Sequence, residues 1–258
     1  MAAAWKSWAL TDVGAVRTSN EDTFVDRPDI GLWAVADGAG GHEHGEVASG
    51  MLAEALGSLS NLAGSDLVAQ VRACVSEIHH TLRTRADAEA EATGGAVTIA
   101  STIVLFLASG PHYASMWAGD SRGYLLRAGE LARMTRDHSL VQVLVDEGVL
   151  SEAEAEHHPH ANVITRAIGA DGLPPELDKI TGRAQPGDRF LLCSDGLNKA
   201  LDERTIAQLT GAADPARRLI AAALERGVRD NVTAIVLEFD SPDDDEATQI
   251  RRPGGPAV

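Results

Sequence analysis

The chain has 258 residues, of which 44% are hydrophobic and 23% charged, a composition typical of a protein with a packed core rather than of a disordered one. Its formal net charge is −16, and the segment 240–258 carries only five acids and two bases, so most of the acidity belongs to the rest of the chain. Because nucleic acids and anionic membranes are bound mainly through Lys and Arg, this charge argues against both as partners.

Apolar runs that end in turn residues predict strands, and longer stretches with helical periodicity predict helices. In chain order these are a strand at 30–36, helices at 46–59 and 66–88, strands at 101–108 and 114–118, helices at 140–147 and 151–157, a strand at 189–194, helices at 202–209 and 214–226, and a strand at 232–239. Strands and helices do not alternate strictly, as they would in a parallel doubly wound sheet. The order therefore favours an α+β layered sandwich.

Two of the predicted helices carry start signals. Ser151 is followed by Glu154 at the spacing of a capping box, in which each side chain bonds the backbone N–H of the other residue. Asp214 precedes Pro215, which predicts an N-cap followed by proline at the first helical position. We expect helices to begin at these two points.

The last segment, 240–258, is rich in Asp, Pro and Gly and shows no apolar period. We predict one domain over residues 1–239 and a disordered acidic Pro/Gly tail over 240–258. Cys74 and Cys193 lie far apart in apolar stretches without CxxC spacing, which indicates buried thiols rather than a metal or redox motif.

The sequence contains no stretch that approaches the roughly 20 apolar residues needed to span a bilayer. Near the N-terminus, Trp5, Lys6 and Trp8 stand where a signal peptide would have its apolar centre. We therefore expect a cytoplasmic protein without membrane contact, and we expect a monomer.

Acidic residues gather at the ends of predicted strands and in turns. They occur in five short motifs: NED at 20–22, DGAGGH at 37–42, AGDSR at 118–122, SDG at 194–196 and RDN at 229–231. A strand that ends in Asp followed by Gly projects a carboxylate from a rigid element while the backbone turns sharply. Several such ends on adjacent strands would bring their carboxylates together.

Closely packed carboxylates repel one another, so such a cluster predicts a bound cation. Oxygen ligands alone favour Mg²⁺, Mn²⁺ or Ca²⁺ over zinc. Each motif by itself is most often a simple turn, because Asp-Gly and Gly-Asp-Ser are common turn sequences. The evidence for a metal site lies in the set of motifs.

The set and its order resemble the PP2C (PPM) family of metal-dependent protein Ser/Thr phosphatases, especially its compact bacterial members. The resemblance covers residues 7–239 and rests on five blocks: TDVGAVRTSNED, VADGAGGHEHGEVAS, WAGDSRGYLLRAGELARMTRDHSLVQVLVDEGVLS, PGDRFLLCSDGLNKAL and RDNVTAIVLEF. It implies a four-layer αββα sandwich with two central antiparallel β-sheets and a binuclear Mn²⁺ or Mg²⁺ centre at one end. The blocks VADGAGGH and WAGDSR also resemble the phosphatases encoded with type VI secretion systems.

The positions that match the family's motifs give the implied metal ligands. Asp37 would bridge two ions, the Gly38 carbonyl would bind the first, and Asp195 and Asp230 would complete the second. Asp120 matches a position that, in bacterial relatives, helps to hold a third and weaker ion together with the second-metal aspartate. Its alternative interpretation is a simple hairpin turn.

Three other residues are implied in or beside the site. Glu21 and Asp22 would lie in or next to the metal shell, and we favour Asp22 as the closer one. Arg17 matches the arginine that binds substrate phosphate, since a planar guanidinium with paired donors suits a phosphoryl group. Otherwise Arg17 is a surface residue pairing with Glu21. Residues 148–170 match the family's variable flap.

The implied chemistry is attack by a metal-activated water, because two ions can lower the pKa of a bridging water and clamp the attacking and leaving oxygens. The sequence holds no Cys-x5-Arg loop, no DxDx[TV] motif and no GxxxxGK[ST] loop, which removes support for thiol, aspartyl and NTPase chemistry. The proton donor stays open, since Ala39 replaces a His found in some relatives. Water at Asp120, His42 and His138 are the alternatives.

The resemblance predicts a protein Ser/Thr phosphatase that opposes a bacterial Ser/Thr kinase, with that kinase and its forkhead-associated substrate as partners. Two alternatives stay open. A catalytically weak phosphoprotein-binding regulator should lose at least one of Asp37, Asp195 or Asp230, and the sequence keeps all three. A metallo-hydrolase of small phosphate esters would use the same metal chemistry, and only a comparison of substrates separates it.

Overall fold

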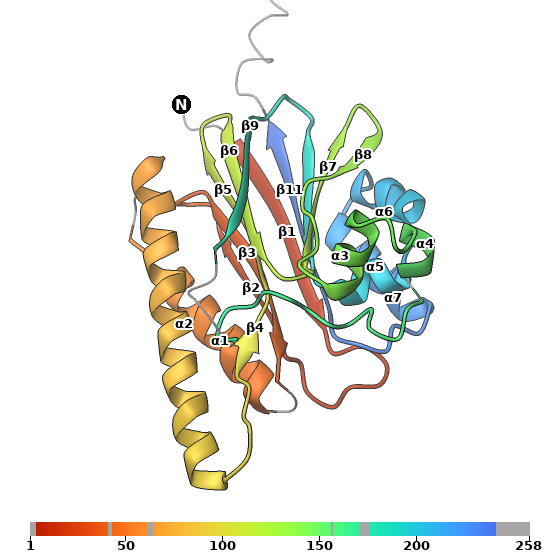
Figure 1. The fold of residues 1–258 in the computed structure, drawn as a ribbon. Coiled ribbons are helices and arrows are strands. Elements are labelled where there is room, and N and C mark those ends of the chain that lie inside the picture. The colour runs from red at the N-terminus through yellow and green to blue at the C-terminus, as the bar shows by residue number, and fades with distance from the viewer. Residues whose placement is uncertain (1–3, 41–42, 61–63, 156, 171–175, 241–258) are drawn as a thin grey trace, which may run out of the picture.

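Two antiparallel sheets stand face to face in the computed structural model, which describes residues 4–40, 43–60, 64–155, 157–170 and 176–240 (Figure 1). The first sheet has the order β1 (Ala4–Asp12), β11 (Val232–Asp240), β10 (Arg189–Cys193), β7 (Arg122–Arg127) and β8 (Glu130–Arg133). The second has the order β2 (Asp22–Arg27), β3 (Leu32–Ala39), β5 (Ile103–Ser109), β6 (His112–Ala118) and β9 (Asp178–Arg183), with the short β4 (Ala100–Ser101) paired to β3.

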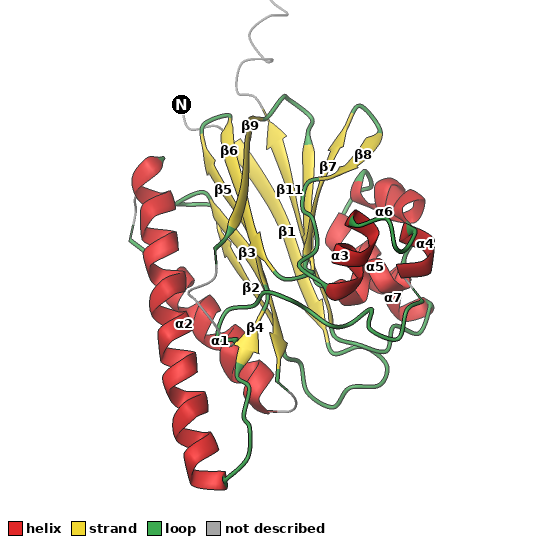
Figure 2. Ribbon diagram, viewed as in Figure 1, coloured by secondary structure: helices red, strands yellow, loops and turns green. Residues whose placement is uncertain are grey.

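Helices cover the outer face of each sheet (Figure 2). Beside the second sheet lie α1 (Glu43–Gly57) and α2 (Ser65–Thr93), and beside the first lie α5 (Asp195–Ala200), α6 (Glu203–Thr210) and α7 (Pro215–Glu225). Two short helices, α3 (Leu140–Asp146) and α4 (Glu152–Ala155), stand on the connection between β8 and β9. The four layers confirm the predicted αββα sandwich.

Alternation along the strands fills three separate cores. On β3, Trp33 points into the core between the sheets, whereas Ala34 points into the core under α1 and α2. On β11, Ile235 and Ala234 divide in the same way between the inter-sheet core and the core under α5, α6 and α7. Each sheet is therefore buried on both faces, which explains the nearly continuous apolar runs of these strands.

Phe106 stands in the middle of the inter-sheet core and has no exposed surface. Its ring lies 4.6 Å from that of Phe190 and 5.4 Å from that of Trp5. We expect Phe106→Ala to lower the free energy of unfolding by about 3–5 kcal/mol, since a buried aromatic ring is lost and a cavity is left. Urea denaturation measures the change. Val149→Ala is the matched control because Val149 is 62% exposed; a similar loss in both variants would contradict the assignment of this core.

The predicted elements agree with the structure for the long helices and the most apolar strands, and they miss β1, β2, β7, β8, β9 and α5. The capping box is confirmed, since Glu154 Oε2 accepts from the Ser151 N–H at 2.8 Å and Ser151 Oγ accepts from the Glu154 N–H at 3.3 Å. Asp214 stands at the predicted N-cap position, but the expected capping hydrogen bond is absent. This residue precedes α7 with a φ of 50°, makes no capping bond and pairs with Arg217 at 2.9 Å instead.

Within the described ranges, no helix is long and apolar enough to cross a membrane. Cys193 is fully buried as expected, and Cys74 is partly buried. The predicted tail lies outside the described residues except for Asp240, which ends β11. The domain boundary therefore stays a prediction.

Candidate metal centre

The strand ends that carry the aspartates of the five acidic motifs lie at one end of the sandwich, the lower end in Figure 1. Asp22 begins β2 and pairs in register with Asp37 near the end of β3. Asp120 follows β6, Asp195 follows β10 as the first residue of α5, and Asp230 precedes β11. The electrostatic influence of the other four carboxylates on Asp37 shows that the fold brings the five together. Both sheets contribute to the cluster.

Asp22 joins the two sheets. Its Oδ2 accepts hydrogen bonds of 2.7 Å from Ser194 Oγ, at the end of β10, and from Thr233 Oγ1 on β11. Burial raises the pKa of Asp22, the two hydroxyl donors oppose that rise, and the charges of Asp195 and Asp230 add to it; the pKa lies at about 7. Asp22 thus holds the carboxylate cluster across the gap between the sheets.

Asp37 has the most crowded electrostatic surroundings of the set. Burial raises its pKa well above the ordinary range for a carboxyl group, and the negative charges of Asp22, Asp195 and Asp120 raise it further. The backbone of Asp37 is fixed, since its carbonyl accepts from the Thr102 N–H at 2.8 Å and from Ser101 Oγ at 2.9 Å. A carboxylate in this position stabilises a nearby cation strongly.

Glu21 lies where the end of β3 and the start of α1 come close together. Its carbonyl accepts from the Gly38 N–H at 3.1 Å. A Cβ at Gly38 would lie 2.2 Å from the Gly45 carbonyl oxygen, and a Cβ at Gly45 would lie 2.2 Å from Glu21 Oε2. Glycine at both positions is therefore required for this approach, and Glu21 is buried beside the strand end.

Asn231 is a positioning residue whose role the sequence interpretation missed. Its Nδ2 donates to the carbonyls of Val13 at 2.9 Å and Ser19 at 3.0 Å, and its Oδ1 accepts from the Glu21 N–H at 2.9 Å. The buried amide thus ties the loop before β2 to the loop before β11. Its place in the RDN motif was visible, but its partners are more than 200 residues away in the chain.

Two of the carboxylates are engaged by basic side chains. Arg17 forks onto Asp230, with Nε 2.9 Å from Oδ1 and Nη2 3.1 Å from Oδ2. Lys199 pairs through Nζ with Asp195 Oδ2. Across the described part of the chain, no three carboxylate, imidazole or thiol groups already stand around one point as ligands. Loading a cation onto Asp195 or Asp230 therefore has to compete with these ion pairs.

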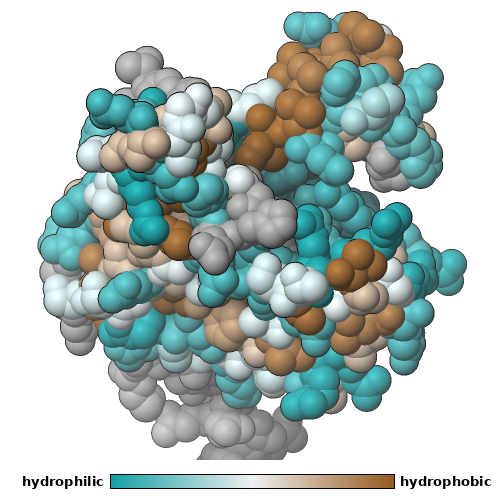
Figure 3. Space-filling model, turned by 90° about the horizontal axis from the view of Figure 1, so that it is seen from below, coloured by the Kyte–Doolittle hydropathy of each residue, from teal (hydrophilic) through white to brown (hydrophobic). Residues whose placement is uncertain are grey.

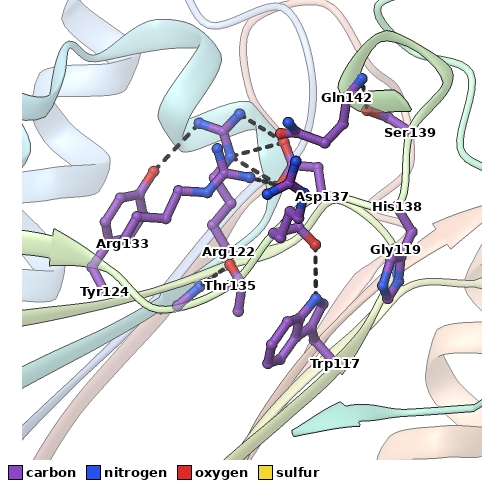
Figure 4. Close-up of polar contacts among 12 residues, drawn as sticks. Trp117, Gly119, Arg122, Tyr124, Arg133, Thr135, Asp137, His138, Ser139 and Gln142 are labelled. Carbon is purple, nitrogen blue, oxygen red and sulfur yellow. Dashed lines mark hydrogen bonds and ion pairs between the residues drawn. The ribbon is translucent and has the colours of Figure 1, made fainter. Parts of the chain in front are cut away.

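The turn that carries Asp120 is held by His138 (Figure 4). The backbone N–H of Gly119 donates to His138 Nδ1 at 3.2 Å, and the N–H of His138 donates to the Gly119 carbonyl at 2.9 Å. The imidazole ring lies parallel to that of Trp117, with centroids 6.3 Å apart. Burial raises the pKa of Asp120, and the charge of Asp195 raises it further, to about 7.

A polar cluster behind this turn contains two arginines and one carboxylate (Figure 4). Arg122 donates from Nε and Nη2 to Asp137 Oδ2 at 3.1 and 2.8 Å, and Arg133 also pairs with Asp137. The side chain of Asp137 is only 10% exposed. Arg122 is the first residue of β7 and lies two residues after Asp120. The cluster therefore fixes the start of β7, next to the turn that carries Asp120.

The donors that converge at this end fit a divalent cation. They are carboxylate and carbonyl oxygens, whose mutual repulsion a hard cation relieves. Figure 3 shows this end of the molecule, whose surface is largely hydrophilic. A hollow lies beside a projecting part of the molecule, on the side of α3 and α4, and that part carries apolar surface. Val143, Val149 and Val163, which belong to the segment between β8 and β9, are all exposed.

Comparison with known proteins places the chain in a family. The family model described as protein phosphatase 2C matches residues 16–234, which is most of the chain. The chain belongs to the protein phosphatase 2C family.

Two curated phosphatases are similar in sequence to this chain over most of its length. The serine/threonine protein phosphatase PstP of Mycobacterium tuberculosis is 41% identical over 234 residues, which cover 89% of this chain and 44% of PstP. The chain thus spans less than half of that relative's length. The serine/threonine phosphatase stp of Listeria monocytogenes is 31% identical over 242 residues, covering 89% of this chain and 94% of the relative.

Solved structures of protein phosphatase 2C members share the fold. PppA, described as a key regulatory component of the type VI secretion system in Pseudomonas aeruginosa, aligns with a TM-score of 0.81 and 38% identity over 91% of this chain and 97% of PppA. The catalytic domain of PstP in complex with two manganese ions aligns with a TM-score of 0.79 and 36% identity over 92% of this chain and 99% of that domain. Both likenesses agree with the antiparallel αββα architecture.

The raised carboxyl pKa values of this protein phosphatase 2C member predict how pH affects stability. A carboxyl group whose folded pKa lies above its unfolded value binds more protons in the folded state, so stability falls as pH rises between the two values. For Asp22 and Asp120 that window runs from about 4 to about 7. Without added metal, we expect the melting temperature to fall between pH 5 and pH 7.5.

Calorimetry in chelator-treated buffers of constant ionic strength measures this trend. Mn²⁺ should reverse it and release protons on binding, because a metal takes up the deprotonated carboxylates. The Asp120→Asn variant, which removes one of the titrating groups, should show a shallower slope. A slope that is equally steep in this variant, or that rises with pH in the wild type, would contradict the electrostatic account.

Proposed function

We propose that this chain is a metal-dependent phosphatase that hydrolyses phosphoserine and phosphothreonine in proteins. The single observation that carries the proposal is the gathering of carboxylates from both sheets at one end of the sandwich, in a member of the protein phosphatase 2C family. The complex of the PstP catalytic domain with two manganese ions supports Mn²⁺ or Mg²⁺ as the cofactor of this centre.

In this proposal Asp37, the Gly38 carbonyl, Asp195 and Asp230 would hold two divalent ions, with Asp37 shared between them. The ions, when bound, supply the activation of the attacking water and positive charge for the transferred phosphoryl group. Asp22 would lie in or next to the metal shell, and its Oδ2 keeps the hydroxyl partners Ser194 and Thr233, which link the two sheets.

Glu21 and Asp120, the other residues expected in or beside the metal shell, have supporting roles in this proposal. Glu21, whose carbonyl accepts from the Gly38 N–H, would lie in or next to the shell of the first ion, and Asp120 would help Asp195 to hold a third ion.

Arg17 binds the substrate phosphate in this proposal. Its guanidinium stands at the edge of the cluster with 49% of its side chain exposed, and its fork is directed at Asp230. When Asp230 serves as a ligand, its charge is shared with a cation, so Arg17 can present paired donors to a phosphoryl group. Arg17 thereby orients the phosphate next to the carboxylates rather than taking part in bond cleavage.

The proton donor to the leaving group is not His138 in this proposal. Its Nδ1 accepts a hydrogen bond from Gly119, its Nε2 lies 3.2 Å from Asp178 Oδ2, and its side chain is only 11% exposed. Burial also lowers its pKa. His42 lies outside the described residues. A water molecule in the neighbourhood of Asp120 is the candidate that we retain.

The physiological partners follow from the relatives and are part of the same proposal. PppA is described as a regulatory component of a type VI secretion system, which supports a role for this chain in such a system. A cognate Ser/Thr kinase and its forkhead-associated substrate would then be the phosphoproteins acted on, and a cytoplasmic location and a monomeric state remain our expectations. The retention of Asp37, Asp195 and Asp230 favours an enzyme over a phosphoprotein-binding regulator.

Hydrolysis of p-nitrophenyl phosphate and of a phosphothreonine peptide tests the proposal directly. Each substrate is assayed with Mn²⁺, Mg²⁺ or EDTA, in the wild type and in Asp195→Asn. We expect metal-dependent release of phosphate from both substrates that is lost in EDTA and in the variant. Turnover of the small ester alone would favour the small-phosphoester hydrolase, and no turnover by a folded, metal-loaded protein would favour the binding regulator.

A further inference from the structure

The buried face of α2 contains an imidazole ring. Within α2, which the structure describes from Ser65 to Thr93, the buried side chains are those of Leu67, Val71, Val75, His79, Leu82 and Ala86. They recur every three or four residues, so they form one stripe that packs against the second sheet. His79 is only 2% exposed. Because a polar group buried in an apolar stripe costs free energy unless it is hydrogen-bonded, the partner of His79 indicates the role of the ring.

The partner of His79 is the backbone of Gly169. The Gly169 N–H donates to His79 Nδ1 at 3.0 Å, and this contact is buried. Nδ1 can accept only when the ring is neutral and carries its proton on Nε2. Burial lowers the pKa of His79, and the charges of His80 and Arg83 lower it further, which favours this neutral form. The ring thus ties the segment between β8 and β9 to α2.

The backbone at Gly169 lies close to two other elements. Its φ is 89°, and a Cβ there would lie 2.2 Å from the Ile99 carbonyl oxygen and 3.0 Å from Leu82 Cβ, so only glycine fits. The preceding residue, Ile168, is fully buried and exchanges two backbone hydrogen bonds of 2.8 and 2.9 Å with Ser101. Residues 168–169 are therefore packed between α2 and β4.

Ser101 continues these contacts to the metal centre. It belongs to β4, which lies at the lower end of the sandwich in Figure 1, and it pairs in register with Gly38. Its Oγ donates to the Asp37 carbonyl at 2.9 Å. A continuous series of hydrogen-bonded segments therefore runs from His79 to the strand end that carries Asp37 and Gly38.

We propose that His79 is a positioning residue of the metal centre: its Nδ1 holds residues 168–169 against β4, and β4 in turn fixes the backbone of Asp37 and Gly38. The inference rests on the proposed function, in which these two residues bind the ions. Without the acceptor, the Gly169 N–H is buried without a partner, a state that the backbone relieves by moving away from α2. His79 acts through the backbone of β4 and takes no part in bond cleavage.

Three substitutions separate the hydrogen bond of His79 from its packing. His79→Phe keeps a planar ring and removes the acceptor, whereas His79→Asn offers an amide oxygen near the position of Nδ1. Val75→Ala is the control for packing, because Val75 is 2% exposed and lies one turn earlier in the same stripe. Urea denaturation gives the loss of stability in each variant, so effects on the centre can be compared with effects on the whole fold.

Hydrogen exchange of backbone amides, followed by NMR on the metal-free protein, measures the contacts themselves. Relative to the amides of β5, the Ile168 and Ser101 amides should exchange at least about 10-fold faster in His79→Phe than in the wild type, because local opening becomes easier. His79→Asn and Val75→Ala should keep the wild-type ratio. Equal ratios in His79→Phe and the wild type would overturn the proposal. If His79→Phe does not fold, His79→Leu also removes the acceptor and is measured in the same way.

Isothermal titration with Mn²⁺ measures the effect on the centre. The dissociation constant should rise about 3- to 10-fold in His79→Phe, less than the roughly 10- to 100-fold that loss of a direct partner of a metal ligand costs. His79→Asn and Val75→Ala should bind as the wild type does. Faster exchange with an unchanged dissociation constant would overturn the proposal, as would an equal rise in Val75→Ala. If the wild type binds no Mn²⁺, the proposed function fails as well, so the two failures are distinguishable.

Discussion

Replacing Asp37 by Asn should abolish phosphatase activity and at the same time stabilise the protein that holds no metal. The loss of turnover should be at least about 10³-fold, or on the order of 4 kcal/mol of transition-state stabilisation, because the carboxylate at the centre of the cluster is removed. The gain in stability follows from the raised pKa of Asp37, since the folded state disfavours its charged form through burial and the neighbouring carboxylates.

Two measurements on Asp37→Asn separate these effects. Steady-state hydrolysis of the phosphothreonine peptide with Mn²⁺ gives the activity, and the melting temperature at pH 8 with chelator gives the stability. At pH 8 the wild type carries the greatest unrelieved repulsion, so the difference in melting temperature should be larger there than at pH 5. A variant that keeps its turnover with Mn²⁺, or that melts below the wild type at pH 8, would show that Asp37 does not have the proposed role.

Gly196→Ala should disable the site without removing any charged group. A Cβ at this position would lie 2.1 Å from the carbonyl oxygen of Asn231, a contact that the backbone has to relieve. The overpacking should cost about 1–3 kcal/mol of stability. Because the strain falls between Asp195 and Asp230, these two carboxylates should move apart, and a displacement of about 1 Å can lower the rate about 10²-fold.

Gly50→Ala is the matched control for this substitution. Gly50 lies within α1, and nothing stands within 4 Å of the position that its Cβ would take. Alanine in a helix interior is about 0.5–1 kcal/mol more favourable than glycine, so this variant should be slightly more stable and fully active. Isothermal titration with Mn²⁺ and the peptide assay compare both variants. Equal metal affinity in Gly196→Ala and the wild type would contradict the close approach.

Sequence patterns predicted the strands with long apolar runs and the helices with a clear apolar period. β3 and β11 are buried on both faces and appear as continuous apolar runs. β1, β2, β8 and β9 are edge strands, whose charged and polar residues are typical of edges and conceal their pairing. Only the partner strand, which is distant in the sequence, decides that such a segment is extended.

The aspartates of the candidate site could be placed from motif order, but the side chains that hold them could not. Ser194 and Thr233 reach Asp22 across 172 and 211 residues of sequence. No local pattern distinguishes a hydroxyl that braces a carboxylate from one that faces water. Lys199 is the exception, since its spacing from Asp195 in SDGLNKAL was visible and indicates a contact on one helix face.

The hydroxyl bridge from Asp22 to Ser194 and Thr233 makes the centre depend on both halves of the sandwich at once. Neither sheet contains a complete set of the proposed ligands, since Asp37 comes from one and Asp195 and Asp230 from the other. An ion bound by these residues would therefore connect the two sheets at this end of the sandwich. Heating should remove catalysis and tertiary structure in a single transition, because the strands of the two sheets alternate along the chain and no single cut separates one sheet from the other.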